Sequence, residues 1–218
     1  MDYVFHFGVV FAAFDRIAQG AWLTLTLSVG AMVFGLLIGA LCAVAAVFGG
    51  GLAAGLVRAY VEAIRNTPFL IQLFLFYFGL PSLGLALDPV PAALIGMSVN
   101  CGAYATEIVR AGILAIPHGQ IEAARALALR TPQIVRHIVL RPALLVAYPA
   151  LTSQFVLVML GSSVVSTISA EELTATGHIL ETETFRPFEV YIVVTAIYVG
   201  LAFGLKALFG LLHRRFLR

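Results

Sequence analysis

The sequence predicts an all-α membrane protein with about five membrane-spanning helices in one domain, residues 1–218. The chain is 61% hydrophobic and only 11% charged, whereas about a quarter of the residues of a soluble domain carry charge. Long runs also lack any charged residue, and a helix needs about 20 apolar residues to cross a bilayer. These uncharged runs cover residues 17–57, 66–87, 89–106 and 142–170.

The runs predict membrane-spanning helices at about 21–47, 58–80, 89–112, 143–167 and 189–212. Aromatic residues within 1–20 predict a short helix at the outer membrane interface. Gly35 and Gly39 are one turn apart in the first span and permit close contact with another helix. Three glycines at 49–51 end that span. Pro68 predicts a kink or break in the second span, because the residue before a proline is disfavoured from helical geometry.

The basic residues predict the orientation in the membrane. With the N-terminus outside and five spans, only Arg16 and Arg186 of the 13 basic residues fall outside. Lysine and arginine favour the cytoplasmic side of a membrane protein. We therefore expect the C-terminus in the cytoplasm and an acidic loop, residues 171–188, outside. Cys42 and Cys101 are expected to be small, buried apolar residues.

A charged segment at about 113–141 separates the third and fourth spans and must lie outside the bilayer. Pro117 and Gly119 interrupt the third span, and Thr131-Pro132 is typical of a helix start with threonine as the cap. The segment between them predicts a helix over 120–129, with Glu122 in its first turn. Two short helices at an angle would form an elbow that can lie in a groove of a partner protein; a helix resting on the lipid surface is the alternative. The predicted apolar face of the first helix comprises Ile121, Ala124, Leu127 and Ala128.

The chain carries no motif of an enzyme or of an energy source. Its single lysine, Lys206, is not part of a GxxxxGK[ST] phosphate-binding loop. Zinc-protease, CxxC and Gly-x-Ser-x-Gly motifs are also absent from the sequence. We therefore expect no catalytic residue, no metal ligand, no cofactor bound by this chain and no nucleic-acid partner.

The charged segment resembles the cytoplasmic motif of the permease subunits of binding-protein-dependent ABC importers. That motif reads Glu-Ala-Ala, three residues, Gly, nine residues, Ile, any residue, Leu, Pro. The present chain matches its spacing with Glu122, Ala123, Ala124, Ala128, Ile138, Leu140 and Arg141. The flanking sequence is similar to the polar amino acid uptake branch over about residues 18–215, notably GAWLTLTLS at 20–28, VEAIRNTPFLIQLFLFYFGLP at 61–81 and SSVVSTISAEEL at 162–173.

The resemblance implies the type I ABC importer permease fold in a bacterial inner membrane. Its implied partners are a second permease subunit (the same chain or a homologue), two ATPase subunits that bind ATP and magnesium, an extracytoplasmic solute-binding protein and membrane lipid. The elbow would dock in the ATPase through Gly119, Glu122, Ala123, Ala124 and Ala128.

The chain departs from the family pattern in three places. Ala128 stands where the motif has glycine, so a turn with positive φ would be strained there. Arg141 replaces the motif proline, which follows as Pro142. Gly161-Ser162 stands where amino acid permeases often have a charged or amide pair, which leaves the class of amino acid open.

Polar residues within the spans are the candidates for a substrate pathway. They are Gln72, Asn100, Glu107, Ser162 and Ser163. Hydrogen bonds between helices are the alternative role for the uncharged ones, and an ion pair with Arg110 for Glu107. An ATP-independent carrier or channel and a non-transporting scaffold or sensor remain alternative functions. The scarcity of ionisable residues in the spans argues against an ion-driven carrier.

Overall fold

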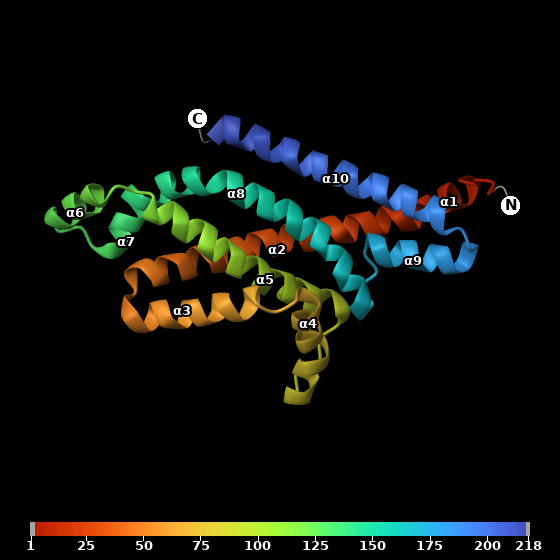
Figure 1. Ribbon diagram of the computed structural model, residues 1–218, viewed down its shortest axis with the longest axis horizontal. Helices are drawn as coiled ribbons and strands as arrows, with labels where there is room; N and C mark the ends of the chain where they lie inside the picture. Colours follow the sequence, from red (N-terminus) through yellow and green to blue (C-terminus); the bar gives the residue numbers. More distant parts are fainter. Residues whose placement is uncertain (1–2, 217–218) are drawn as a thin grey trace.

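The computed structural model describes residues 3–216, nearly all of them helical; residues 1–2 and 217–218 of the expected single domain lie outside the described part. Four long helices run along the longest axis of the molecule (Figure 1). They are α2 (Phe14–Phe48), α5 (Pro89–Leu114), α8 (Leu140–Gly161) and α10 (Pro187–Phe216). All four are long and apolar enough to cross a membrane, and a bent helix pair is a candidate for a fifth span. The prediction of about five spans is confirmed.

The close contact expected at the paired glycines of the first span is confirmed. A Cβ on Gly35 would lie 2.6 Å from the Cβ of Cys101, and one on Gly39 would lie 2.5 Å from the Cβ of Ala105. These glycines therefore let α2 approach α5 at the centre of the bundle. Cys101 is buried as predicted, whereas Cys42 is half-buried. The helix begins at Phe14 rather than near 21, after the short α1 (Gly8–Ala12).

The second predicted span, 58–80, is not one straight helix. It consists of α3 (Gly50–Arg65), α4 (Phe69–Phe74), a π-helical turn η1 (Leu75–Gly79) and a 3₁₀ turn η2 (Leu80–Leu83). The predicted break at Pro68 is confirmed, and the two parts meet at 106°. Figure 1 shows α4 pointing away from the bundle of long helices. The predicted start at 58 was wrong because α3 begins directly after Gly49.

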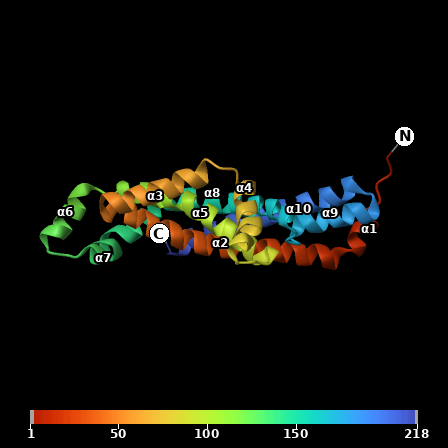
Figure 2. The same cartoon turned by 90° about the horizontal axis from the view of Figure 1, so that it is seen from below.

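The elbow lies at the end of the molecule opposite the N-terminus in both views (Figure 1, Figure 2). It contains α6 (His118–Ala126) and α7 (Thr131–Ile134). From α7 the chain passes through a π-helical turn η3 (Val135–Val139) into α8 and then a 3₁₀ turn η4 (Ser162–Ile168). These pieces form one helical segment of 38 residues, Thr131–Ile168. The predicted fourth span, 143–167, therefore starts too late, because the second helix of the elbow and the span form one continuous helical segment.

The acidic segment 171–188 was expected to be an outer loop, but it contains the helix α9 (Leu173–Thr184). Glu172 caps this helix, since its carboxylate accepts a hydrogen bond from the backbone N–H of Ala175 at 3.0 Å. The Glu172 side chain is fully buried. Its carboxylate is satisfied there because the hydroxyls of Thr24 and Tyr198 also donate to it, at 3.2 and 2.6 Å. One expected surface acid thus joins α2, α9 and α10.

Two further acids of the same region bind the N-terminal part of the chain. Glu189 is fully buried and accepts hydrogen bonds from the hydroxyl of Tyr3 and the backbone N–H of His6, at 2.5 and 2.9 Å. Glu183 is exposed and accepts two hydrogen bonds from the guanidinium of Arg16, at 2.7 and 3.1 Å. These bonds from Arg16 lower the pKa of the Glu183 carboxyl.

Candidate functional site

The elbow has one buried face and one exposed face. Ala124 and Ile134 are buried in the core that continues from the bundle, with Ile121 and Leu129 packed against it. The opposite face exposes Glu122, Ala123, Arg125, Ala126 and Leu127 to solvent. Leu127 was predicted on the buried face, yet 76% of it is exposed. The reason is that α6 ends at Ala126, so the chain reverses before Leu127 can turn inward.

The reversal depends on a positive φ at Ala128, the position where the family motif has glycine and where strain was expected for alanine. Ala128 has φ +56°, a conformation that favours glycine. Its N–H donates to the carbonyl of Arg125 at 2.9 Å, and the N–H of Leu129 donates to the carbonyl of Ala124 at 3.1 Å. This pair of bonds is the Schellman ending of a helix, in which a left-handed residue satisfies the last carbonyls. The hydrogen bonds of the turn are thus made by the backbone, without a side-chain cap.

Three details of the predicted elbow were wrong. Gly119 does not interrupt a helix but is the second residue of α6, while Pro117 occupies the cap position. Glu122 is the fifth residue of α6 and does not lie in its first turn. Arg130, rather than Thr131, caps α7, because its backbone N–H bonds to the Gln133 side-chain oxygen at 2.8 Å.

The predicted pathway residues Gln72 and Asn100 lie side by side near the bend at Pro68. The side-chain N–H of Asn100 donates to the Gln72 side-chain oxygen at 2.9 Å. The Gln72 amide nitrogen in turn donates to the carbonyls of Ile64 and Thr67, at 2.7 and 3.0 Å, and to the Thr67 hydroxyl at 2.9 Å. The Ile64 carbonyl would normally bond to residue 68, but proline has no N–H. Gln72 supplies the missing donor.

Asn100 also borders a cavity of about 240 Å³ between α4, α5 and α8. Tyr104 and Gln154 are its other large polar residues, and its remaining lining is Phe69, Met97, Leu157, Val158 and Gly161. The sequence reasoning did not single out Gln154, although it is the sole side-chain amide in the uncharged run 142–170. A single amide side chain in a long uncharged run was the sequence signal that could have indicated Gln154 as a candidate pathway residue.

Ser162 and Ser163 do not join this cavity. Ser162 is fully buried and donates to the carbonyl of Met159 at 2.7 Å. Ser163 donates to the carbonyl of Leu160 at 2.9 Å and borders a different hollow, between α8 and α10. Both hydroxyls therefore bond within their own helix.

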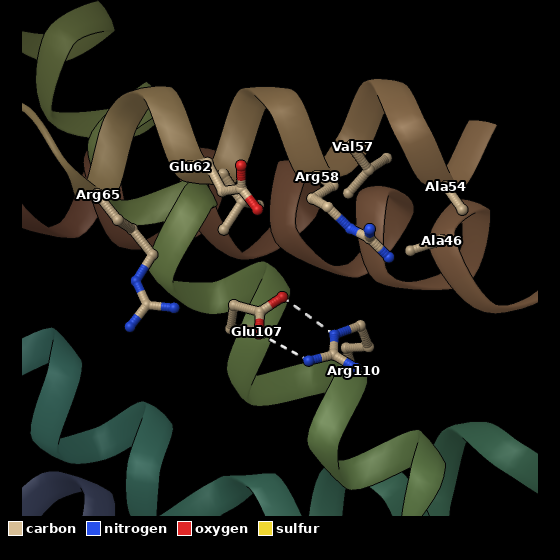
Figure 3. Close-up of a pocket in the computed structure, with 9 residues that line it drawn as sticks. Ala46, Ala54, Val57, Arg58, Glu62, Arg65, Glu107 and Arg110 are labelled. Atoms are coloured by element: carbon tan, nitrogen blue, oxygen red, sulfur yellow. Dashed lines mark hydrogen bonds and ion pairs between the residues drawn. The ribbon is translucent and has the colours of Figure 1, made fainter. Parts of the chain in front are cut away.

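A second, charged cavity of about 390 Å³ lies between α2, α3 and α5. Figure 3 shows Arg58, Glu62 and Arg65 reaching toward it from α3, with Glu107 and Arg110 on α5. The predicted ion pair is confirmed: Arg110 donates to both carboxylate oxygens of Glu107, at 3.0 and 2.7 Å. Glu107 thus keeps a cation partner while facing the cavity.

Tyr104 stands between the two cavities. It borders the uncharged one, and it also lines a smaller hollow that includes Glu62 and Arg65. The guanidinium carbon of Arg65 lies 5.3 Å from the centre of its ring, within the range of a cation–π contact. Asn100, Tyr104, Glu107 and Arg110 follow at helical spacing, so one face of α5 carries polar groups from the bend at Pro68 toward the elbow.

Residues 35–218 match the family described as binding-protein-dependent transport system inner membrane component. The chain belongs to this family. The glutamine transport system permease protein GlnP of Escherichia coli (strain K12) is 33% identical over 213 residues, covering 97% of both chains. The L-cystine transport system permease protein TcyB of Bacillus subtilis (strain 168) is 30% identical over 200 residues, covering 91% of this chain and 86% of the relative.

The fold of this inner-membrane component is also that of its solved relatives. A crystal structure of an amino acid ABC transporter with histidines superposes with a TM-score of 0.86, at 32% identity, over 98% of this chain and 100% of that one. The all-helical, type I importer fold predicted from the resemblance is therefore confirmed.

Proposed function

We propose that this chain is the permease subunit of an ATP-driven ABC importer that moves polar amino acids across the cytoplasmic membrane. The observation that carries the proposal is the likeness over nearly the whole chain to amino acid permeases and to the structure of an amino acid ABC transporter. Relatives named for glutamine and for L-cystine support an amino acid substrate. ATP and magnesium would be bound by the partner ATPase, and this chain would carry no catalytic residue.

The exposed face of α6 would dock in the ATPase. Ala123 and Ala126 are small enough to let the partner backbone approach closely, and Glu122 and Arg125 offer charges for orientation. Gly119 lies at the start of the same helix, and the buried Ala124 and the turn residue Ala128 set its position. Because α7 continues into α8 without a break, a displacement of the elbow would be carried directly into the membrane.

Substrate would pass along the polar face of α5. Asn100 and Gln154 border an uncharged cavity suited to hydrogen-bonding a polar amino acid, with Glu107 further along the same face. A second permease subunit, a copy or a homologue, would close the path on its open side. Binding must be weak, since a transported solute has to leave again. Gln72 would act through Asn100, whereas Ser162 and Ser163 point elsewhere.

The orientation follows from the charges. Figure 1 places the elbow and the turn between α2 and α3 at the same end of the molecule, toward which the C-terminus also points. Since basic residues favour the cytoplasm, this end would be cytoplasmic and the N-terminus and α9 would be outside. A cysteine introduced at the exposed Ala126 should be labelled from the cytoplasm only. Labelling from outside would contradict this orientation.

The elbow assignment is tested by Glu122→Lys. Reversing this exposed charge should lower both amino acid uptake and co-purification of the ATPase at least about tenfold, because a buried interfacial charge pair contributes about 2–5 kcal/mol. Gln120→Lys, on the same exposed helix, is the matched control and should have a smaller effect. Wild-type uptake and ATPase retention in Glu122→Lys would overturn the assignment. Uptake by this chain alone, abolished when ion gradients are collapsed, would instead support the carrier alternative.

A further inference from the structure

Two neighbouring hollows between α8 and α10, together called the α8–α10 groove, lie outside the proposed substrate path. One hollow in it, of about 390 Å³, is bordered by Tyr148, Thr152 and Ser153 from α8 and by Lys206, Phe209 and His213 from α10. A second, of about 380 Å³, is bordered by Leu160, Ser163, Val199, Ala202 and Phe203, among others. The two helices are antiparallel (Figure 1), so the basic hollow lies toward the C-terminal end of α10 and the apolar one nearer the middle of that helix.

Lys206 brings a positive charge into this groove without an ion-pair partner. Lys206 is the sole charged residue between Val190 and Leu212. The segment that faces it, residues 142–170 of the same chain, contains no charged residue. Across residues 3–216 its one charge-related neighbour is the ring of Phe203, whose centre lies 5.9 Å from the ammonium nitrogen. Lys206 follows Val190 by about 24 Å of helix, which places it near the edge of a hydrocarbon layer about 30 Å thick.

His213 supplies a second unsatisfied group in the same hollow. Its Nδ1 is buried and has no hydrogen-bond partner in the described part of the chain, and the ring centre lies 5.1 Å from that of Tyr148. A buried polar atom without a partner is costly. The hydroxyls of Thr152 and Ser153 already donate to the carbonyl of Pro149, at 2.9 and 3.1 Å. Lys206 and His213 are therefore the groups left to hold an anion.

We propose that this groove binds one anionic phospholipid of the cytoplasmic leaflet. The phosphate would lie between Lys206 and His213, and an acyl chain would follow the apolar hollow past Ala202. Basic pockets between membrane helices on the cytoplasmic side are suited to such head groups. The adjoining apolar hollow selects a lipid over a free anion. The bound lipid would tie α10 to the bundle, to which it otherwise adds little buried surface: 11% of its apolar window is buried, against 61% for α5.

The test measures lipid binding by the whole transporter, purified with its ATPase and stripped of lipid. Mixed micelles containing phosphatidylglycerol or phosphatidylcholine are titrated in, and bound lipid is counted by native mass spectrometry. Phosphatidylglycerol should bind more tightly, and Lys206→Gln should weaken its binding about fivefold. Arg214→Gln removes an equal charge at the same end but outside the groove, and should change binding less. Equal binding by wild type and Lys206→Gln would overturn the proposal.

Two further arms separate a lipid from a free anion. Ala202→Trp fills the apolar hollow and should reduce phosphatidylglycerol binding while leaving both charged groups in place. Inorganic phosphate should not displace the lipid at millimolar concentration. Displacement by phosphate, or full lipid binding by Ala202→Trp, would overturn the lipid assignment. The thermal midpoint in phosphatidylcholine shows whether each variant is folded. If Lys206→Gln does not fold, His213→Gln replaces it and should likewise weaken phosphatidylglycerol binding. Because the readout is bound lipid, it is independent of whether the transporter moves amino acids.

Discussion

The chain turns sharply at Pro68 and again at the elbow, and the two turns are stabilised by different means. At Pro68 a buried side chain holds the turn: Gln72 is 4% exposed and bonds to two carbonyls, a hydroxyl and Asn100. At the elbow the backbone closes on itself around the left-handed Ala128, and the surrounding side chains are exposed. The polar side chains at the Pro68 turn bond to one another and to the backbone, whereas those at the elbow remain available to a partner.

The difference follows from the surroundings of each turn. Within a membrane, water does not satisfy a broken helix, so each freed carbonyl needs a donor from the protein. Outside the membrane, water can satisfy the backbone, and a turn can present its side chains instead. The bend at Pro68, which depends on the buried Gln72, should be costly to disturb, whereas the elbow should be alterable on its surface with little loss of stability. Four substitutions test this contrast.

The largest effect is expected at the inner turn. Gln72→Leu keeps the apolar bulk but leaves the Ile64 carbonyl with only a long bond of 3.4 Å from the Thr67 hydroxyl and takes away the Gln72 partner of the Asn100 amide. It should lower the free energy of unfolding by about 3 kcal/mol. Unfolding of the purified permease in mixed micelles measures it. The same substitution at the elbow, Gln133→Leu, removes one exposed bond from the N–H of Arg130. A loss at Gln133 as large as that at Gln72 would refute the contrast.

The next effect concerns the two legs of the elbow, the end of α5 and the start of α8. A Cβ on Gly112 would lie 2.5 Å from the backbone carbonyl oxygen of Ala143. Gly112→Ala should therefore force the legs apart and cost about 2 kcal/mol, with a matching fall in uptake. Gly119→Ala is the control, because no atom lies within 4 Å of a Cβ there. If Gly112→Ala were as stable as Gly119→Ala, the legs would not be in close contact.

A smaller and opposite effect is expected at the turn itself. The left-handed conformation of Ala128 is sterically strained, so Ala128→Gly should stabilise the elbow by up to about 1 kcal/mol. Slower hydrogen exchange at the N–H groups of Ala128 and Leu129 would show this locally. Faster exchange there would mean that the added freedom of glycine in the unfolded chain outweighs the relieved strain.

The smallest effect belongs to the exposed face of α6. Ala126→Ser places a hydroxyl on an exposed helical position and should change the free energy of unfolding by less than about 0.5 kcal/mol. Any change in ATPase retention by this variant would therefore report on docking and not on folding. A clear loss of stability would show that this face is packed against the permease itself.

Several features of the site were predictable because they depend on local chemistry. The break at Pro68 follows from the geometry of proline, and the strain at Ala128 follows from alanine standing where the family motif has glycine. The ion pair of Glu107 and Arg110 follows from their helical spacing. The burial of Glu172 and Glu189 was not predictable, because their partners Thr24, Tyr198 and Tyr3 come from distant parts of the chain. Gln154 was missed for the same reason: it borders the same cavity as Asn100 but comes from a different helix.

By itself, the sequence determined that this protein lies in a membrane, about how many times it can cross and that its second span breaks at Pro68. These properties depend on runs of apolar residues and on the backbone limits of glycine and proline, which act over a few residues. The tertiary structure alone decided which distant polar groups meet, that α7 and α8 form one continuous helical segment, and that α8 and α10 leave a groove between them. Such contacts join residues far apart in the chain, and their geometry is set by how whole helices pack.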